Sequence, residues 1–346
     1  MSTTFSVIIA LYNCEPYIEA CLASLVGQTH RDFEAIVVDD CSTDDGLAVA
    51  RACVEGDARF RFLQMERNSG QGAARNRALA EARGDVIVLL DADDMLAAHA
   101  LERIAARFER QQLDDLYFNA TSFYEDAEAY RCVVEDFSQR ASFDDVATGT
   151  ELFTFFEQRD QFFAHGALHA VTRDFVESAH IRFPEGVIHE DLLFTFQILV
   201  AAQRSSFLNE PLYERRIRTG STMAQPRRTM RNVEGHLVSV RWMERWMDAH
   251  VDELDPSFVE AMAHRLSKYL EICAYDYLTD VTDDEKAAHI AALTPREALA
   301  FQMDVAQRAA LMREMYESKT WRVGNAVVAI PRRLRDGLKA LLRKKG

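Results

Sequence analysis

Short apolar runs alternate with helical patterns along residues 5–121, and this alternation is the main fold signal in the chain. Runs rich in Val, Ile, Leu and Phe predict buried strands, at Ser6–Leu11, Phe33–Val38, Phe60–Gln64, Val86–Leu90 and Leu116–Thr121. Helical patterns lie between these runs, at Pro16–Val26, Gly46–Val54, Gly72–Ala82 and Ala98–Arg110. Strands that alternate with helices in this way predict βαβ units, and therefore an α/β fold with a mostly parallel sheet flanked by helices.

The pattern changes in the second half of the chain. Residues 122–220 mix aromatic strands with short helices, whereas the pattern from about residue 227 to 315 is helical. Trp242 and Trp246 stand four residues apart and therefore share one face of a helix. Packing into the core is the favoured interpretation of this face, and it is also a candidate homodimer surface. The pattern divides the chain into residues 1–110, 111–224, 225–315 and 316–346.

The composition excludes some classes of protein. The chain has 346 residues, of which 48% are hydrophobic and 27% are charged, as in a soluble globular protein with room for two domains. Its formal net charge of −15 argues against a nucleic-acid partner, which would need a basic footprint. We find no signal-peptide pattern at the N-terminus and no apolar run long enough to cross a membrane. These observations predict a cytoplasmic protein.

The C-terminal segment differs in charge from the rest of the chain. Residues 319–346 contain nine Lys and Arg against a single acid. Apolar residues at Leu334, Leu338, Leu341 and Leu342 would form one stripe of a helix with cations around it. Such a helix can lie on an anionic membrane surface, which predicts peripheral attachment to the inner face of the cell membrane. The alternative is a helix that packs on the acidic body of the same protein.

The strand Val86–Leu90 leads directly into three carboxylates, those of Asp91, Asp93 and Asp94. Open α/β folds bind their ligands at the carboxyl edge of the sheet. Carboxylates this close repel one another unless a cation lies among them. Oxygen ligands suit Mg²⁺ or Mn²⁺, and such an ion would usually also hold substrate phosphates. This acid block therefore predicts a cation and phosphate site, although a solvated acidic turn fits the segment equally well on its own.

Other strands end in groups suited to a nucleotide. Tyr12, just after the first strand, can stack on a base, and Asp39, at the end of the second, can accept the imide hydrogen of uracil. Arg75 follows the third strand and can neutralise phosphate. A cation would then bridge the acid block to the diphosphate. Together these strand ends predict a site for a nucleoside diphosphate.

The order of these segments resembles the family-2 glycosyltransferases of the GT-A fold, of the bacterial polysaccharide type. The resemblance covers residues 5–110 well and residues 160–222 more loosely. Its matching segments are Ser6–Asn13, Ser24-Leu25 with Gln28-Thr29, Val37–Asp44, Asn68 with Gly70 and Ala74–Asn76, and Asp91–Asp94.

The resemblance implies a nucleotide-sugar donor, usually UDP-linked, and a divalent cation, Mn²⁺ or Mg²⁺. Residues 1–110 would bind the donor, and residues 111–224 the acceptor. The implied donor-binding residues are Ala10, Tyr12, Asp39, Arg75, Asp91, Ala92 and Asp93. Among them, Tyr12 and Asp39 correspond to the residues that bind the nucleoside in the family. Asp93 and Asp94 are the two candidate metal ligands, and Asp93 is favoured.

Sugar transfer also needs a base that takes the proton of the acceptor hydroxyl. Glu190 and Asp191 precede an apolar helical run, a pattern that equally suits acids at the start of a helix. The resemblance implies that Asp191 is the base and that Glu190 holds the site or helps to select the acceptor. A single base without a carboxylate nucleophile implies inversion at the anomeric carbon, with the leaving diphosphate stabilised by the cation. The expected acceptor is a glycan or a lipid-linked sugar. Arg218 and Ser221 are candidates to reach the diphosphate, although a basic edge strand followed by a turn explains their segment equally well.

Two other functions remain as alternatives. A sugar-nucleotide nucleotidyltransferase would need a Gly-rich first loop with cations, but residues 10–13 contain neither. A non-catalytic nucleotide-sugar-binding protein would have the same fold, and the presence of Asp39, Asp93 and Asp191 argues against it. A dehydrogenase or a P-loop enzyme is excluded because the sequence has neither of their phosphate-binding motifs at the expected place.

Overall fold

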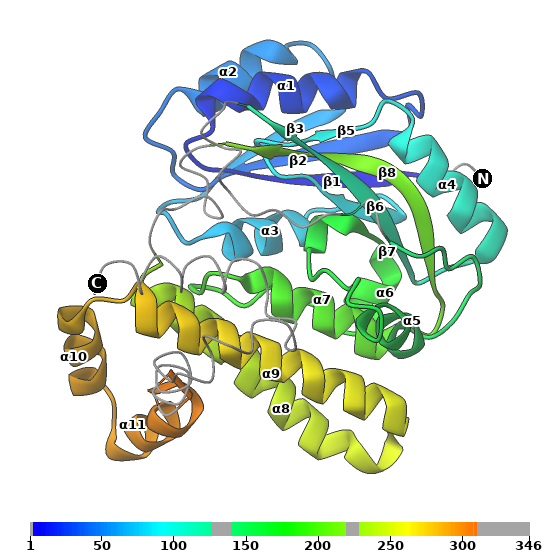
Figure 1. Ribbon diagram of the computed structural model, residues 1–346. Coiled ribbons are helices and arrows are strands. Elements are labelled where there is room, and N and C mark those ends of the chain that lie inside the picture. The colour runs from blue at the N-terminus through cyan, green and yellow to red at the C-terminus, as the bar shows by residue number, and fades with distance from the viewer. Residues whose placement is uncertain (1–2, 126–136, 138–139, 219–227, 307, 310–346) are drawn as a thin grey trace. The chain divides into compact units, whose positions relative to one another are not determined.

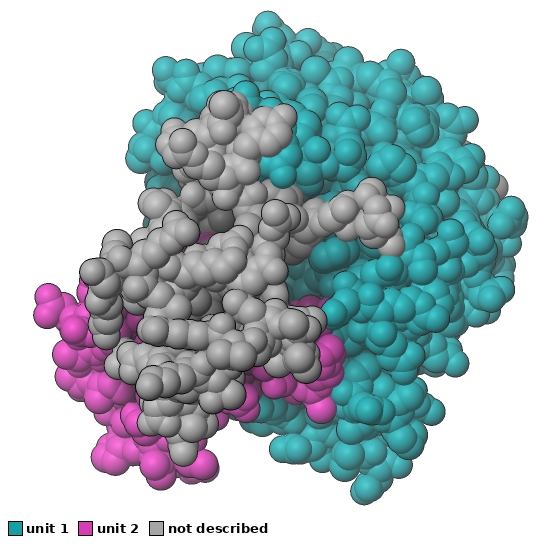
Figure 2. All heavy atoms as spheres, viewed as in Figure 1, with its two compact units in different colours: residues 1–224, 242–262 teal, residues 225–241, 263–346 magenta. Residues whose placement is uncertain are grey.

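The computed structural model describes residues 3–125, 137, 140–218, 228–306 and 308–309. The chain divides into two compact units, residues 1–224 with 242–262 and residues 225–241 with 263–346 (Figure 2). The predicted boundary at residue 224 coincides with a boundary between these units. Residues 242–262 of the predicted helical region belong to the first unit, however. The predicted basic tail, residues 316–346, lies outside the described residues.

Within the described residues, the first unit contains one eight-stranded sheet in the order β3-β2-β1-β4-β7-β6-β8-β5. Its first half is parallel, as the sequence predicts, and is built from β1 (Phe5–Leu11), β2 (Phe33–Asp39), β3 (Phe60–Gln64) and β4 (Val86–Leu89). Helices cover both faces, which is why β4 is buried throughout. Figure 1 shows α1 (Glu15–Val26) and α2 (Gly46–Cys53) on one face and α3 (Gln71–Leu79) on the other.

The second half of the sheet is mixed, while the predicted α/β fold with a mostly parallel sheet flanked by helices is confirmed. β7 (His169–Thr172) runs antiparallel to both of its neighbours, β4 and β6 (Asp115–Tyr124). β5 (Met95–Leu96) runs antiparallel to β8 (Ser205–Ile217), whereas β6 and β8 are parallel. The reversal of β7 escaped the sequence pattern because residues 122–168 lack the regular strand–helix alternation from which direction is inferred.

The described residues of this half also form α4 (Ala100–Gln111), α5 (Gly149–Glu157), the short helical turn η3 (Gly166–Leu168), α6 (Arg173–Ser178) and α7 (Glu190–Ala201). α5 begins at a capping box in which Thr148 and Glu151 bond reciprocally. Aromatic side chains fill the core between α5 and the sheet. The ring centroids of Tyr117, Phe156 and Phe207 lie between 4.8 and 5.9 Å apart.

The region after the sheet is helical, as predicted, and contains α8 (Met230–His250), η4 (Val251–Glu253), α9 (Pro256–Thr279), α10 (Asp283–Ala292), α11 (Pro295–Phe301) and η5 (Gln302–Ala306). Trp242 and Trp246 of α8 both stand edge-on to the ring of Phe196, with centroids 5.9 and 5.4 Å away. The two tryptophans therefore pack on the buried Phe196 while staying partly exposed, and a homodimer stays a prediction. In the part of the chain that the structure describes, no helix has the length and apolar character that a membrane crossing requires.

Candidate active site

The ends of β1, β2 and β4 meet at one edge of the sheet. Leu11 lies opposite Asp39 in the parallel register, and the Leu90 amide donates to the carbonyl of Ile8. Tyr12 follows at the end of β1 and is 45% exposed. The next residue, Asn13, adopts a left-handed backbone and accepts a hydrogen bond from the amide of Thr43 at 2.8 Å. The loops after β1 and β2 are therefore tied together, with the ring of Tyr12 accessible beside them.

The two adjacent acids at the end of β2 have different surroundings. Asp39 is buried, and its carboxylate accepts bonds from the Ser42 amide and the Gln64 side chain, both at 3.2 Å. Asp40 accepts from the amides of Ser69 and Gly70 and so fixes the loop before α3. Asp40 thus has a structural role, whereas Asp39 lies opposite Leu11, the residue before Tyr12. Ala10 is half-buried in β1.

The three carboxylates of the acid block also differ in their partners. Asp91 Oδ1 accepts from Arg75 Nη2 at 2.6 Å and from Gln71 Nε2 at 3.0 Å. Asp93 Oδ2 accepts from Arg218 Nε at 2.9 Å. Asp94 is 4% exposed, and its two oxygens accept from the hydroxyl of Tyr213 and the amide of Arg216 at 2.7 and 2.6 Å. Ala92, between them, is buried.

Asp94 is therefore the weaker of the two candidate metal ligands. Both of its oxygens already accept hydrogen bonds from protein donors, and the side chain is buried, which leaves little access for a metal ion. The Asp93 side chain is 22% exposed and forms an ion pair with Arg218, which is also partly exposed. This geometry favours Asp93 over Asp94, and both stay predictions.

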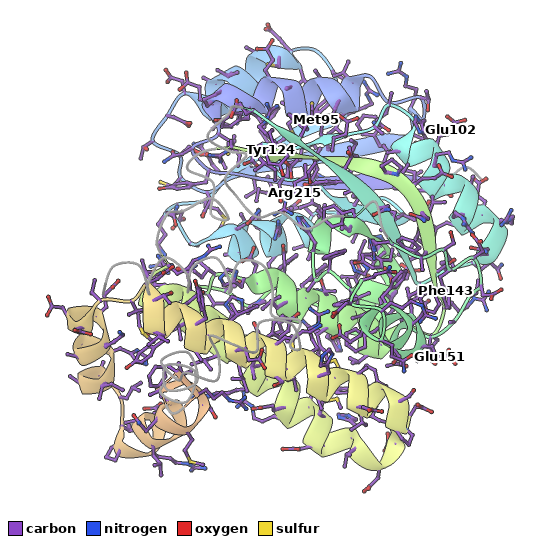
Figure 3. The ribbon with its side chains drawn as sticks, in the orientation of Figure 1. Met95, Glu102, Tyr124, Phe143, Glu151 and Arg215 are labelled. Atoms are coloured by element: carbon purple, nitrogen blue, oxygen red, sulfur yellow. The ribbon has the colours of Figure 1, made fainter. Side chains whose placement is uncertain are left out.

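The charges of the acid block are not balanced. Burial and the nearby negative charge of Asp91 raise the pKa of Asp93 despite the Arg218 guanidinium. Burial and the charges of Asp93 and Asp91 raise the pKa of Asp94 well above its usual range. For Asp91, burial opposes ionisation, but Arg75 and other positive groups, including Arg215, outweigh it and lower the pKa. Figure 3 labels Arg215 on β8, near the end of the strand that leads to Arg218.

The charge around Asp93 suits a divalent cation. Asp93 is a partly exposed carboxylate beside an excess of negative charge, which a cation would relieve. Among the described residues, no group of three or more His, Cys, Asp or Glu side chains could hold a metal ion alone. Mg²⁺ and Mn²⁺ commonly use one or two carboxylates and take their remaining ligands from water and substrate phosphates. The residues present therefore suit an ion that arrives with a diphosphate.

Arg75 has a different position from the one that the sequence suggested. Its side chain is 2% exposed and forms ion pairs with Asp91, Glu190 and Asp191, at 2.6, 2.9 and 2.8 Å. These three negative charges raise the pKa of Arg75 although burial alone would lower it. That Arg75 neutralises phosphate stays a prediction; in the structure its guanidinium is enclosed and paired with protein carboxylates.

Glu190 and Asp191 form the first turn of α7, and His189 precedes them with a left-handed backbone. Burial and the neighbouring charge of Asp191 raise the pKa of Glu190 to about 7, against the effect of Arg75. The Asp191 side chain is 24% exposed, so it is accessible where Glu190 is not. Gly166 leaves space beside it, because a Cβ built there would lie 3.2 Å from Asp191 Oδ1.

Some residues of this site could not be identified from the sequence. Tyr213 and Arg216 anchor the acid block from β8, about 120 positions further along the chain. Asn76 pairs with the backbone of Phe183 through two bonds of 2.9 Å and thereby attaches α3 to the segment before α7. The only sequence signal for Asn76 was its place beside Arg75 in a family-like segment. Of the two candidates in the closing segment, Arg218 contacts Asp93, and Ser221 lies outside the described residues.

Comparison with known proteins indicates the family to which the chain is similar. Residues 6–174 match the family model described as glycosyl transferase family 2. The chain is similar to glycosyltransferase GlyA of Streptococcus pneumoniae serotype 4, with 28% identity over 272 residues, which cover 77% of this chain and 36% of that protein. The chain therefore spans little more than a third of the length of GlyA.

Solved structures resemble the fold. The structure of S. aureus TarS 1–349 in complex with UDP-GlcNAc has a TM-score of 0.65 and 22% identity, covering 90% of this chain and 91% of that one. Mannosyltransferase PcManGT from Pyrobaculum calidifontis, in complex with GDP-Man and Mn²⁺, has a TM-score of 0.53 and 19% identity, covering 99% of this chain and 87% of that one. These likenesses show the GT-A fold.

Proposed function

This chain belongs to the family-2 glycosyltransferases, and from that premise we propose that it transfers a sugar from a nucleotide sugar to a hydroxyl of a glycan or lipid-linked acceptor. One observation carries the proposal: Asp91, at the donor-binding edge, and Asp191, the candidate base, are held by the same guanidinium. A base can deprotonate an acceptor hydroxyl beside a bound sugar only if the two sites adjoin.

The donor is held by groups at the ends of the parallel strands. Tyr12 stacks on the base, and Asp39 accepts its imide hydrogen, which favours uracil. The exposed ring of Tyr12 supports this assignment, and so does the likeness to a protein solved with UDP-GlcNAc. Asp91 and the backbone at Ala92 face the ribose and diphosphate, with Ala10 beside the nucleoside. Burial of Asp39 means that only a small part of the base can reach it, as a selective contact requires.

Asp191 acts as the general base. It removes the proton of the acceptor hydroxyl, whose oxygen bonds to the anomeric carbon as the bond to the diphosphate breaks, so that the configuration inverts. Glu190 is buried beside it and holds the start of α7. Asp93 is the residue that would hold a divalent cation, together with the diphosphate itself. A bound cation of this kind stabilises the negative charge of the leaving group.

The alternative functions receive less support. In a nucleotidyltransferase, an oxygen of the sugar phosphate attacks a phosphorus atom of the nucleotide. This oxygen is already anionic, so the reaction does not need a base such as Asp191 on the acceptor side. A non-catalytic binding module would not need Asp191 to be accessible, yet its side chain is 24% exposed beside Gly166. Attachment of the basic tail to the inner face of the membrane remains part of the proposal, on the sequence pattern alone.

Ligand binding tests the proposal most directly. We expect UDP-GlcNAc with Mn²⁺ to raise the thermal midpoint of the chain, since a ligand of the folded state stabilises it. Asp93→Asn should abolish the added effect of Mn²⁺ while keeping a weaker effect of UDP. The matched control is Asp174→Asn, which alters an acid 88% exposed on α6. If no nucleotide or nucleotide sugar shifts the midpoint of the wild-type chain, the proposal is wrong.

A further inference from the structure

Arg75 occupies a position between the two functional sides of the site. Its helix, α3, closely approaches the segment before α7, because Gly72 has no side chain. A Cβ at Gly72 would lie only 2.6 Å from the carbonyl oxygen of Pro184. Asn76, on the same helix, fixes that segment through its two bonds to Phe183. α3 is thus held against the entrance to α7, and this brings Arg75 within reach of the acids there.

The Arg75 guanidinium is held in place by several partners. Its carbon lies 5.0 Å from the ring centroid of Phe183, which stacks on Phe194 at 3.9 Å. Nη2 donates to Asp91, and Nη1 donates to both Glu190 and Asp191. The planar fork of an arginine fixes the directions of its N–H groups, which a lysine ammonium cannot do. One rigid group therefore sets the position of the Asp191 carboxylate relative to Asp91.

We propose that Arg75 is a positioning residue, which orients the candidate base Asp191 toward the donor held at Asp91. The inference rests on the proposed function. Asp91, in the loop after β4, and Asp191, in α7, stand 100 positions apart in the sequence, and the Arg75 side chain forms an ion pair with each of them. Burial at 2% means that Arg75 acts through these acids rather than on a ligand.

The test compares Arg75→Lys with Arg77→Lys. Arg77 lies on the same helix with its side chain 51% exposed and paired to Glu81, so it is a matched control outside the site. For each variant, kcat for UDP-GlcNAc turnover and Kd for UDP with Mn²⁺ are measured, the latter by calorimetry. We expect Arg75→Lys to lower kcat by about 10- to 100-fold, the usual cost of misplacing a catalytic group, and to change Kd less than about threefold. Arg77→Lys should match the wild type in both.

Making Arg75→Lys in the Asp191→Asn variant as well as in the wild type separates a positioning role from a structural one. If Arg75 acts through Asp191, then adding Arg75→Lys to Asp191→Asn should lower the residual rate by less than about twofold, because residues that act as a unit are not additive. The same fold-loss in both backgrounds, or a parallel loss of kcat and UDP affinity, would overturn the inference and leave Arg75 as a structural ion cluster. If Arg75→Gln folds, its kcat and Kd provide a third comparison. If it does not fold, the result for Arg75→Lys decides between the two roles.

The outcomes also distinguish this inference from the proposed function. A wild-type chain that neither binds nor turns over UDP-GlcNAc, nor any other nucleotide sugar, contradicts the proposed function itself. A wild-type chain that turns over donor, with Arg75→Lys equal to it, contradicts only the positioning role.

Discussion

The two halves of the first unit are held together by contacts of different range. In the donor half, the loops are tied to one another locally, as Asn13 is to Thr43 and Asp40 is to Ser69, about 30 positions apart. In the acceptor half, the important contacts reach back across the chain, as Tyr213 does to Asp94 and Glu190 does to Arg75. Nucleotide binding should therefore depend on local structure, and chemistry on the contacts between the halves.

The sharpest way to break this comparison is Asp191→Asn. Removal of a general base costs about 10²- to 10⁴-fold in rate, so we expect kcat for sugar transfer to fall by that factor. UDP affinity should stay within about twofold, because Asp191 lies outside the donor half. Steady-state transfer assays and calorimetry measure the two quantities. Equal transfer by wild type and variant would remove Asp191 as the base, and Asp174→Asn controls for loss of a surface acid.

Tyr12→Ala should have the reciprocal effect. Loss of stacking on a base costs about 1–3 kcal/mol, so UDP affinity should fall by about 5- to 150-fold, while kcat at saturating donor changes little. Calorimetric titration with UDP gives the affinity. Tyr12→Phe keeps the ring and should bind as the wild type does. A large fall in affinity for Tyr12→Phe would show that the hydroxyl, and not stacking, is what matters.

Tyr213→Phe tests the long-range contacts alone. The hydroxyl donates to Asp94 and lies 3.3 Å from the amide of Asp91, which donates to it, and its loss leaves buried polar groups without a partner. We expect the free energy of unfolding to fall by about 1–3 kcal/mol, measured by urea denaturation. The exposed hydroxyl removed in Tyr12→Phe should cost much less. No difference between the two variants would mean that β8 does not anchor the acid block.

Glu190→Gln gives the smallest effect and concerns pH. The pKa of Glu190 is about 7 in the folded chain, above its ordinary value of 4.5, because it is buried beside Asp191. Between these values the folded state binds more protons than the unfolded state, so this group makes the free energy of unfolding fall as pH rises. The variant should lose less stability than wild type between about pH 5 and pH 8. Glu177→Gln, at an exposed position on α6, should keep the wild-type slope.

The donor half could be predicted from the sequence because its signals are local. Each of β1 to β4 is a short run of mainly apolar residues, so its existence and its bounds follow to within a residue or so. Tyr12, Asp39 and the acid block follow directly from where those runs end. The helical region after residue 225 could be predicted equally well, since its apolar spacing persists over whole helices.

The acceptor half could not be predicted in the same way. The direction of β7 depends on a connection without regular periodicity, and the roles of Tyr213 and Arg216 depend on partners far away in the sequence. Arg75 was recognised as part of the site, but its ion pairs could not be predicted from the sequence. Its type and position suggested phosphate, whereas burial and three acids from other elements decide what it binds.

The anchoring of Asp94 by β8 has a consequence for how the chain acquires its site. The acid block is made early in synthesis, but the tyrosine and the backbone amide that orient it emerge only with residues 213–216. A fragment that stops after β4 would contain every acid of the block without the groups that hold it in place. In a nascent chain on the ribosome, the acid block should therefore become fully ordered late, when β8 joins the sheet, after the loops around Tyr12 and Asp39 have formed.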